Sequence, residues 1–377
     1  MIPFYGVDRQ YLSLRDEILD ASDKVYRSGK MLDGDYTTQF EMAMAKYCHR
    51  QYAITVNSGT TGLLLALQSL DRRDNILIPS ISFIATLNSA LLAFSDDKIH
   101  MTDVDFAGLM DLDSVSEQLH LNIDTIMYVN LFGNTIDYDR FRVVTEFFHK
   151  NDIKVVEDAA QSFGASYKGI PSGKMGDISV LSFDPTKNFN NYGSGGMILT
   201  DDAHIAESVR DFKNNGKSTM TRPGVNSKMS EIDCAQMLIK LKYFEQWQRR
   251  RAEIAEHYEQ SFGHFVDLLP TTEGTVHARS KFAFRVGGRN NLQGFLLSEN
   301  IPTLYHYAIP LYDYASTLAG PQMPFLDTAA WGSANFARQT ISLPIYPELT
   351  DSEVEHIADT VKRYFSMVRS VQTAILN

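Results

Sequence analysis

Short apolar runs rich in β-branched residues alternate with amphipathic or Ala/Leu-rich stretches through the first part of the chain. Residues 61–70 and 138–150 are two of the helical stretches. Such alternation is typical of an α/β layer fold with a mostly parallel sheet. We predict the strands of that sheet at residues 52–56, 75–78, 98–104, 125–129, 154–157, 178–183 and 196–200.

From residue 230 the pattern changes to one long helical stretch that ends at residue 262, with apolar side chains at helical spacing. Because this run is much longer than an ordinary helix of a globular protein, we predict a kink or break near the polar residues 246–251. A smaller α/β unit follows it. We expect the strand of this unit at 282–286 and its helices at 292–299 and 351–369, the last introduced by Thr350.

The length agrees with this division into two parts. A chain of 377 residues has room for two or three domains of ordinary size. We therefore expect a large domain over residues 1–245 and a small C-terminal domain over residues 246–377, with the long helix connecting them.

The charge balance excludes two classes of partner. The chain has 35 Lys and Arg residues against 46 Asp and Glu residues, a formal net charge of -11, and it contains no basic tract. Proteins that bind nucleic acid or anionic membranes concentrate positive charge on one face. We therefore expect no nucleic acid and no membrane among the partners, although a local pocket for one small anion is compatible with this composition.

The N-terminus and the cysteines predict a cytoplasmic protein. Asp8 and Arg9 precede any apolar run, unlike the start of a signal peptide. No run of about 20 apolar residues, the length needed to span a bilayer, occurs in the chain. Cys48 and Cys234 stand in no CxxC or Cys/His spacing, so we expect neither a disulfide framework nor a zinc site.

Residues 57–63 form a turn of small residues between a predicted strand and a predicted helix. The free N–H groups at a helix N-terminus, together with the helix dipole, bind phosphate without a basic residue. The hydroxyls of Ser58 and Thr60 would add further donors. Taken alone, the turn is also compatible with a plain helix cap.

Two charged residues follow other predicted strands. Asp158 directly follows the apolar strand at 154–157, and ligands of open α/β sheets collect at the carboxyl ends of such strands. Lys187 follows the strand at 178–183 and a turn that contains Pro185. A partly desolvated lysine has a lowered pKa and acts as a nucleophile and base, whereas most single lysines are solvated surface residues.

The turn, the carboxylate and the lysine together match one cofactor. Pyridoxal phosphate needs an anchor for its phosphate, an acidic partner for its ring nitrogen and an amine that holds it covalently. Since all three features lie at predicted strand ends, the sequence favours a site for pyridoxal 5'-phosphate over three unrelated structural roles.

Two other patterns look functional but fit structural roles better. Residues 216–218 (Gly-Lys-Ser) resemble the end of a P-loop, yet Asp211 stands where that loop requires glycine. Asp103 and Asp105 resemble the metal-binding acidic pair of some glycosyltransferases. Because two-residue acidic patterns are common, we expect a strand end and a helix cap there and predict no metal site.

Short stretches along nearly the whole chain resemble those of the DegT/DnrJ/EryC1/StrS aminotransferases, pyridoxal-phosphate enzymes that aminate keto-sugars attached to nucleotides. The resemblance implies the type I fold of PLP-dependent aminotransferases. The matching stretches are Arg27-Ser28-Gly29 with Gly34 and Phe40-Glu41; Asn57-Ser58-Gly59-Thr60; Pro79-Ser80 with Phe83 and Ala85-Thr86; Asp103-Val104-Asp105; Glu157-Asp158-Ala159-Ala160-Gln161; Ser182-Phe183 with Thr186-Lys187-Asn188; Gly195-Gly196; Gly224 and Asn226 with Met229; His306-Tyr307 with Pro310-Leu311; and Ser342-Leu343-Pro344.

The resemblance implies a role for each matching residue. Lys187 would hold the cofactor covalently and move the proton at the substrate carbon, and Asp158 would face the pyridine nitrogen. Phe83 would stack on the ring, although ordinary core packing would also explain a phenylalanine there. The other cofactor contacts would come from Ser58, Gly59, Thr60 and Ser182 at the phosphate and from Gln161 beside the ring.

Further matching positions imply a second subunit and a sugar substrate. Asn226 matches a position that reaches the phosphate of the other subunit, which implies a homodimer with shared active sites. His306 and Tyr307 lie where some relatives contact the sugar, although tyrosine and histidine also often complete a half-buried loop. Lys217 is a further candidate for substrate binding.

The chain also departs from the family pattern. Thr61-Gly62 replaces the usual Asp-Ala, which we expect to change the packing of the helix. Ser280-Lys281 stands where many relatives have a histidine, and Lys228 replaces a common arginine. We expect these two changes to alter contacts around the sugar or the nucleotide.

The reaction implied by the resemblance is transamination in two halves. L-Glutamate would donate its amino group, and a nucleotide-linked keto-sugar, first of all a 4-keto-6-deoxyhexose, would accept it. The product would serve amino-sugar biosynthesis for a surface polysaccharide, such as the O-antigen of lipopolysaccharide, or another glycoconjugate. The alternatives are a 3-keto sugar nucleotide, a non-catalytic regulator that senses such a ligand, and a metal-dependent glycosyltransferase that uses Asp103 and Asp105.

Overall fold

The computed structural model describes residues 1–70, 74–147, 153–318 and 331–376. The helices within these ranges are α1 (Val7–Ser28), α2 (Asp35–Tyr47), α3 (Gly59–Ser69), α4 (Ile84–Ala93), α5 (Leu112–Gln118), α6 (Tyr138–Phe147), α7 (Ala203–Phe212), α8 (Glu231–Phe262), α9 (Arg289–Ser298), α10 (Leu311–Leu318), α11 (Trp331–Gln339) and α12 (Asp351–Leu376). The strands are β1 (Tyr52–Val56), β2 (Ile76–Pro79), β3 (Ile99–Thr102), β4 (Thr125–Val129), β5 (Lys154–Asp158), β6 (Ser166–Tyr167), β7 (Ile170–Pro171), β8 (Ile178–Ser182), β9 (Gly196–Thr200), β10 (Asp267–Leu268), β11 (Thr275–Val276), β12 (Phe282–Arg285) and β13 (Thr340–Leu343).

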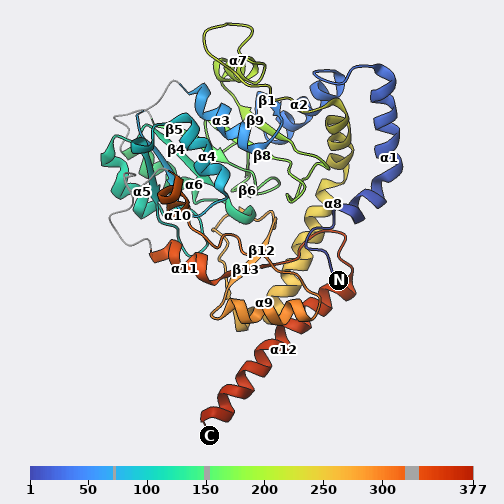
Figure 1. The fold of residues 1–377 in the computed structure, drawn as a ribbon, viewed down its shortest axis with the longest axis vertical. Coiled ribbons are helices and arrows are strands. Elements are labelled where there is room, and N and C mark those ends of the chain that lie inside the picture. Colours follow the sequence, from blue (N-terminus) through green and yellow to red (C-terminus); the bar gives the residue numbers. More distant parts are fainter. Residues whose placement is uncertain (71–73, 148–152, 319–330, 377) are drawn as a thin grey trace.

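A seven-stranded sheet with the order β1-β9-β8-β5-β4-β2-β3 forms the centre of the protein (Figure 1). Neighbouring strands run parallel except at β9, which is antiparallel to both β1 and β8. The predicted α/β class and the mostly parallel sheet are therefore confirmed, and each of the predicted strands is present with small shifts at its ends. The predicted helix at 138–150 corresponds to α6, and residues 148–150 lie outside the described ranges.

Helices cover both faces of this sheet because successive strand residues point to opposite sides. On one face Val156, Val180 and Ile198 pack toward α3, α4 and α7. On the other face Leu181 and Leu199 pack against α1, α2 and α8. Parallel sheets are normally buried in this way, which explains the almost continuous apolar character of the strands.

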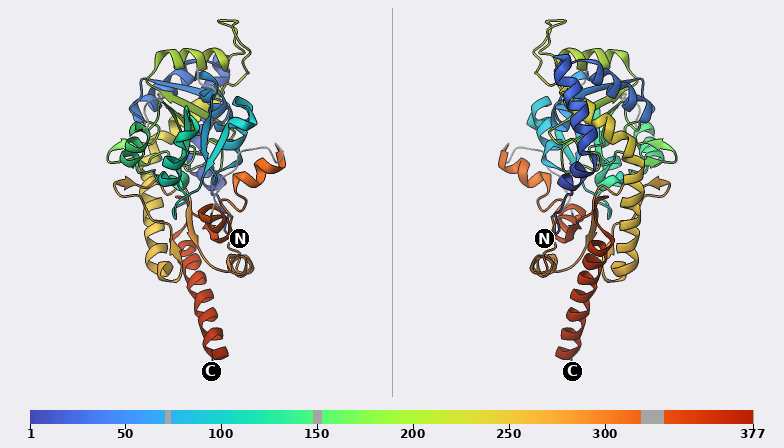
Figure 2. Two further views of the ribbon diagram at one scale, coloured as in Figure 1. Left: turned by 90° about the vertical axis from the view of Figure 1, so that its left-hand side faces the viewer. Right: turned by 90° about the vertical axis from the view of Figure 1, so that its right-hand side faces the viewer.

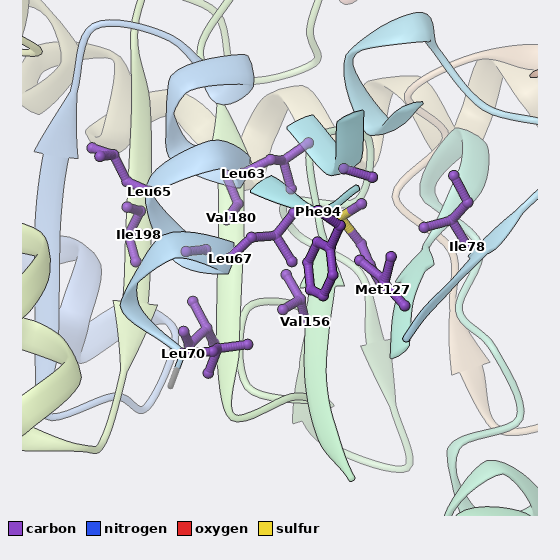
Figure 3. Packing of buried hydrophobic residues seen from close by; sticks show 14 of the residues in the cluster. Leu63, Leu65, Leu67, Leu70, Ile78, Phe94, Met127, Val156, Val180 and Ile198 are labelled. Atoms are coloured by element: carbon purple, nitrogen blue, oxygen red, sulfur yellow. The ribbon is translucent and has the colours of Figure 1, made fainter. Parts of the chain in front are cut away.

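Helix α3 lies close against the strands at the middle of the sheet. Leu63 and Leu67, four residues apart, point into the cluster that contains Val156 and Val180 (Figure 3). A Cβ atom at Gly62 would come within 2.7 Å of the Val180 side chain, so this glycine permits the close approach of helix and sheet. The replacement of the family's usual Asp-Ala by Thr61-Gly62 thus coincides with tight packing of α3.

Helix α8 runs from Glu231 to Phe262 without interruption, so the predicted break near residues 246–251 is wrong. Its polar residues bind backbone groups of other segments. Arg251 donates to the carbonyl of Ile345 at 2.7 Å, and Gln248 donates to that of Ala278 at 3.2 Å. These tertiary hydrogen bonds stabilise the helix through the polar residues, so it does not break there.

A three-stranded antiparallel sheet, β10-β12-β13, forms the smaller part of the fold together with the end of α8, α9 and α12. Segments cross between the two parts. Ile2 joins the core of the smaller part, whereas Leu311 and Ala315 of α10 pack into the core around the large sheet. The division into residues 1–245 and 246–377 stays a proposal, because residues before 245 enter the core of the smaller part and residues after 245 enter the core around the large sheet.

The terminal helix begins at Asp351, as predicted, and continues to Leu376 beyond the predicted end at 369. Its C-terminal part extends away from the rest of the protein (Figures 1 and 2). Thr350 and Glu353 form a capping box, in which each side chain accepts a hydrogen bond from the other's backbone N–H, at 3.2 and 3.0 Å. In the described ranges, no helix combines the length and the apolar character needed to cross a membrane.

Replacing Glu353 with glutamine is expected to destabilise the fold by about 1–2 kcal/mol at pH 7, because Arg9 of α1 loses an ionic partner. Arg9 contacts the two Glu353 carboxylate oxygens at 2.6 and 2.7 Å, and the hydrogen bond lowers the pKa of Glu353 from 4.5 to about 2. A lowered folded-state pKa stabilises the protein above the unfolded value, and the stabilisation is lost as the pH falls toward 2.

Urea unfolding between pH 7 and pH 2 measures this effect. The difference between the wild type and Glu353→Gln should be constant above about pH 5 and should shrink below it. Glu355→Gln is the control, because Glu355 is half-exposed and pairs only with His257, at 3.0 Å, among the ion pairs of the described residues. A Glu353→Gln effect that stayed constant to pH 2 would contradict the assigned ion pair.

Candidate active site

A cavity of about 390 Å³ opens at the carboxyl ends of the parallel strands, between the large sheet and the small one. Turns that follow β1, β2, β5 and β8 form most of its wall. Segments from the N-terminus, from the start of β12 and from the loop before α10 complete it. The side chains on which the arguments below depend are Tyr5, Ser58, Gly59, Thr60, Phe83, Asp158, Gln161, Ser182, Lys187, Lys281, His306 and Tyr307.

The cavity brings together most of the residues proposed from the sequence. These are Ser58, Gly59, Thr60, Phe83, Asp158, Gln161, Ser182, Lys187, His306 and Tyr307. Asn226 and Lys217 lie outside it, on the exposed loop between α7 and α8. For Asn226 this position agrees with the expected contact to another subunit, which stays a prediction. Lys217 does not reach the cavity of its own chain, and its role stays a prediction.

The turn after β1 presents free N–H groups to the cavity. The Ser58 hydroxyl accepts a hydrogen bond from Thr61 N–H at 3.1 Å, and the Ser58 carbonyl accepts one from Gly62 N–H at 2.9 Å. The preceding N–H groups, those of Gly59 and Thr60, belong to the first helical turn, which has no intrahelical acceptor for them. A Cβ at Gly59 would come within 2.8 Å of Ser182 Cβ, so glycine is required where β8 approaches this turn.

Asp158, the last residue of β5, is a buried carboxylate at the cavity wall. One oxygen accepts a hydrogen bond from Ala160 N–H at 3.1 Å and the other accepts one from the Thr86 hydroxyl at 3.0 Å. Burial raises the pKa of Asp158, while the Ala160 amide and the positive charge of Lys187 act in the opposite direction. A carboxylate in this setting gains most from a cationic group placed opposite it.

Lys187 is half-buried and extends from the turn after β8. The turn is held by Asp184, which accepts hydrogen bonds from Thr186 N–H at 2.9 Å and, through its carbonyl, from Lys187 N–H at 2.9 Å. Burial lowers the pKa of Lys187, and the charges of Asp158 and Asp184 oppose this shift. The predicted desolvation of this lysine is therefore present, and it favours the neutral, nucleophilic amine.

An aromatic face completes the cavity. The side chain of Phe83 is 49% exposed at the start of α4, and its ring centre lies 6.1 Å from that of Tyr307. Gln161 donates to the Tyr307 hydroxyl at 3.0 Å and accepts from Phe132 N–H at 3.2 Å, which fixes its side chain. An exposed ring, a carboxylate, a lysine and a set of free N–H groups around one cavity fit pyridoxal phosphate.

Tyr5 and Lys281 line the cavity but were not among the site residues predicted from the sequence, although Lys281 was expected to alter contacts around the sugar or the nucleotide. Tyr5 comes from the N-terminal segment, and burial raises its pKa to about 12. Lys281 precedes β12, and its Nζ donates to the carbonyl of Thr186 at 2.7 Å. The only signal for Lys281 was its replacement of a histidine common among relatives, while Tyr5 carried no signal.

The acidic pair Asp103 and Asp105 has a structural role. Asp103 accepts hydrogen bonds from the N–H groups of Gly332 and Ser333, at 2.9 and 2.7 Å, at the start of α11. Asp105 accepts bonds from two N–H groups of its own loop. These oxygens serve as the caps that the sequence suggested, and within the described ranges no group of three His, Cys, Asp or Glu residues is arranged to hold a metal ion.

The sequence as a whole matches a model of one enzyme family over residues 12–362. The chain belongs to the DegT/DnrJ/EryC1/StrS aminotransferase family. It is 32% identical over 370 residues to the dTDP-3-amino-3,6-dideoxy-alpha-D-galactopyranose transaminase of Aneurinibacillus thermoaerophilus, which covers 97% of this chain and 99% of that protein. It is 30% identical over 374 residues to the dTDP-3-amino-3,4,6-trideoxy-alpha-D-glucose transaminase of Streptomyces venezuelae, with 97% of each chain covered.

A solved relative contains the cofactor in its amine form. The structure of NtdA from Bacillus subtilis with bound PMP superimposes on this aminotransferase with a TM-score of 0.86 and 25% sequence identity, covering 97% of this chain and 85% of that one. The protein is therefore a PLP-dependent aminotransferase, as the three motifs at the strand ends suggested. The fit of the cavity to pyridoxal phosphate agrees with this membership.

Proposed function

We propose that this aminotransferase moves the amino group of L-glutamate to a keto-sugar that is linked to a nucleotide. The observation that carries the proposal is the convergence of Lys187, Asp158 and the start of α3 on one cavity, in a chain whose relatives are named as sugar-nucleotide transaminases. A regulator that only senses a ligand would not require the lysine and the carboxylate together.

The chain's own residues divide the work of the proposed reaction. When bound, pyridoxal phosphate supplies an electron sink for chemistry at the substrate carbon. The Lys187 amine holds the cofactor and then carries the proton between the substrate and cofactor carbons. The Asp158 carboxylate keeps the ring nitrogen protonated.

Three further groups hold the cofactor in place in this proposal. The N–H groups of Gly59 and Thr60, with the hydroxyls of Ser58 and Ser182, bind the phosphate at the start of α3. Phe83 covers one face of the ring. Asn226 reaches the phosphate bound to the other subunit, so the enzyme is a homodimer with shared sites. The exposure of Asn226 on the loop before α8 supports this arrangement.

The names of two relatives support a choice of the carbon that receives nitrogen. The sequence alone favoured a 4-keto-6-deoxyhexose, with a 3-keto sugar as the alternative. The two relatives reported above carry the words 3-amino in their names. We therefore propose a dTDP-linked 3-keto-6-deoxyhexose as the first candidate and the 4-keto isomer as the second. A cytoplasmic location and a role in building a surface polysaccharide or glycoconjugate complete the proposal.

Incubation of the holoenzyme with L-glutamate and a panel of keto-sugar nucleotides tests the substrate. The panel contains 3-keto and 4-keto 6-deoxyhexoses on dTDP, UDP and GDP, and mass spectrometry detects the amino-sugar product. We expect amination of the dTDP-linked 3-keto sugar above all others. Amination of only 4-keto sugars would reassign the carbon, and amination of none of them would refute the proposed 6-deoxyhexose substrate.

A further inference from the structure

Lys281 is a second lysine of the active site. It is 7% exposed and lines the same cavity as Lys187, but it comes from the segment just before β12 in the smaller part of the fold. Its ammonium donates to the carbonyl of Thr186, the residue before Lys187, at 2.7 Å, and it lies 4.6 Å from the centre of the Tyr5 ring. Neither contact neutralises its charge.

The charge of Lys281 has no anionic partner in contact. Among the described residues, no carboxylate oxygen lies within 4.0 Å of its Nζ. Burial lowers the pKa of Lys281, and the neighbouring charges of Lys187 and Arg251 lower it further, while Asp184 acts more weakly in the opposite direction. This setting disfavours the charged form of Lys281, and an anion bound against its Nζ would stabilise the ammonium form.

A second buried lysine shows which of these contacts are structural. Lys240 of α8 also donates to a carbonyl, that of Asn190, at 2.8 Å, and also lies over a tyrosine ring, that of Tyr192, at 3.4 Å. Lys240 does not line the cavity. A carbonyl and a tyrosine ring are therefore enough to hold a lysine inside the protein. Lys281 differs from Lys240 because it also lines the cavity.

We propose that Lys281 binds a carboxylate group of a substrate, next to the carbon that reacts at Lys187. A lysine ammonium has three donors, and the Thr186 carbonyl is the single acceptor found for it among the described residues, so donors remain for a ligand. The carboxylate has two candidate sources, the α-carboxylate of the amino-acid donor and the carboxylate of a hexuronate sugar. The first source needs only an aminotransferase reaction. The second rests on a nucleotide-linked keto-sugar as the acceptor and needs a hexuronate in place of the 6-deoxyhexose proposed above, because a 6-deoxyhexose has no carboxylate.

Two small reagents isolate this contact from the rest of the reaction. Aminooxyacetate and O-methylhydroxylamine both remove the cofactor from its lysine in a PLP enzyme, but only the first carries a carboxylate. Their rates are followed in the holoenzyme by loss of the cofactor absorbance band. The variants are Lys281→Met, Lys281→Arg as the conservative replacement, and Lys240→Met as the matched buried control.

We expect Lys281→Met to slow the reaction with aminooxyacetate by about 10- to 100-fold, the value of a charge-assisted hydrogen bond. The rate with O-methylhydroxylamine should change by no more than about twofold, because this reagent has no carboxylate for Lys281 to bind. Lys281→Arg should restore most of the preference for aminooxyacetate, and Lys240→Met should leave that preference unaltered. An unchanged preference in Lys281→Met would overturn the proposal. Equal loss with both reagents would also overturn it, because Lys281 would then only hold the Thr186–Lys187 turn.

Separate measurements of the half-reaction with the amino-acid donor and the half-reaction with the sugar acceptor identify the source of the carboxylate. If Lys281→Met slows conversion of the cofactor by L-glutamate, or by the best L-amino acid of a panel, the donor's α-carboxylate is the ligand. If that step is unchanged and only the amination of a hexuronate nucleotide falls, the sugar carries the ligand. Failure of the wild type with every keto-sugar nucleotide would refute the proposed function, while the result with the two reagents would still stand.

Discussion

Replacing Lys187 with alanine is expected to abolish transamination, with a loss of activity of about 10⁴-fold or more. The purified variant should also lack the absorbance band that the wild type shows with pyridoxal phosphate, because no other amine takes its place. Lys281, the other lysine that lines the cavity within the described ranges, is held toward the carbonyl of Thr186 at 2.7 Å. Absorption spectra of the dialysed protein and a glutamate-dependent assay measure the two effects.

Lys174→Ala is the matched control for this experiment. Lys174 lies near the amino end of β8 and pairs with Asp201, whereas Lys187 follows the carboxyl end of the same strand. Both the absorbance band and the activity should survive in the control. If Lys187→Ala retained both, the assignment of Lys187 would be wrong, and the cofactor would have to be held by another lysine.

The residues of the site that could be predicted from sequence share a simple property. Ser58, Asp158 and Lys187 each lie at the carboxyl end of an apolar strand or in the turn that follows it, and parallel strands place their carboxyl ends along one edge of a sheet. Local order along the chain was therefore enough to place them together. Helix α1 carries a similar local signal, because Leu14, Ile18 and Val25 lie at helical spacing and are buried.

The remaining features depend on contacts between distant segments. Tyr5 reaches the cavity from the N-terminal segment and Lys281 from the segment before β12, and neither follows a strand of the large sheet. The continuity of α8 has the same origin, because Arg251 and Gln248 find carbonyl partners in the segments that follow the helix. Residue spacing within one segment cannot report such contacts, which explains why the break was predicted there.

The exchange of Asp158 for asparagine should lower the rate of transamination by about 10²- to 10³-fold while the cofactor still binds. The amide has nearly the same shape and keeps an oxygen for the Thr86 hydroxyl, but it carries no negative charge. Without that charge we expect the ring nitrogen of the bound cofactor to lose its proton, so that the cofactor would accept electrons poorly. Single-turnover measurements with L-glutamate should show the loss, and the titration of pyridoxal phosphate should show near-normal binding through the start of α3.

Glu157→Gln is the internal control, because neighbouring residues of a strand point to opposite faces. Glu157 is fully buried away from the cavity and accepts hydrogen bonds from Ser172, Ser179 and backbone N–H groups, at 2.6 to 3.0 Å. Removing its charge should cost about 2–4 kcal/mol of stability and leave the rate per folded site nearly unchanged. The two variants therefore distinguish a carboxylate that acts on the cofactor from a carboxylate that stabilises the fold. If Asp158→Asn instead lost stability and kept its rate, Asp158 would belong to the second class.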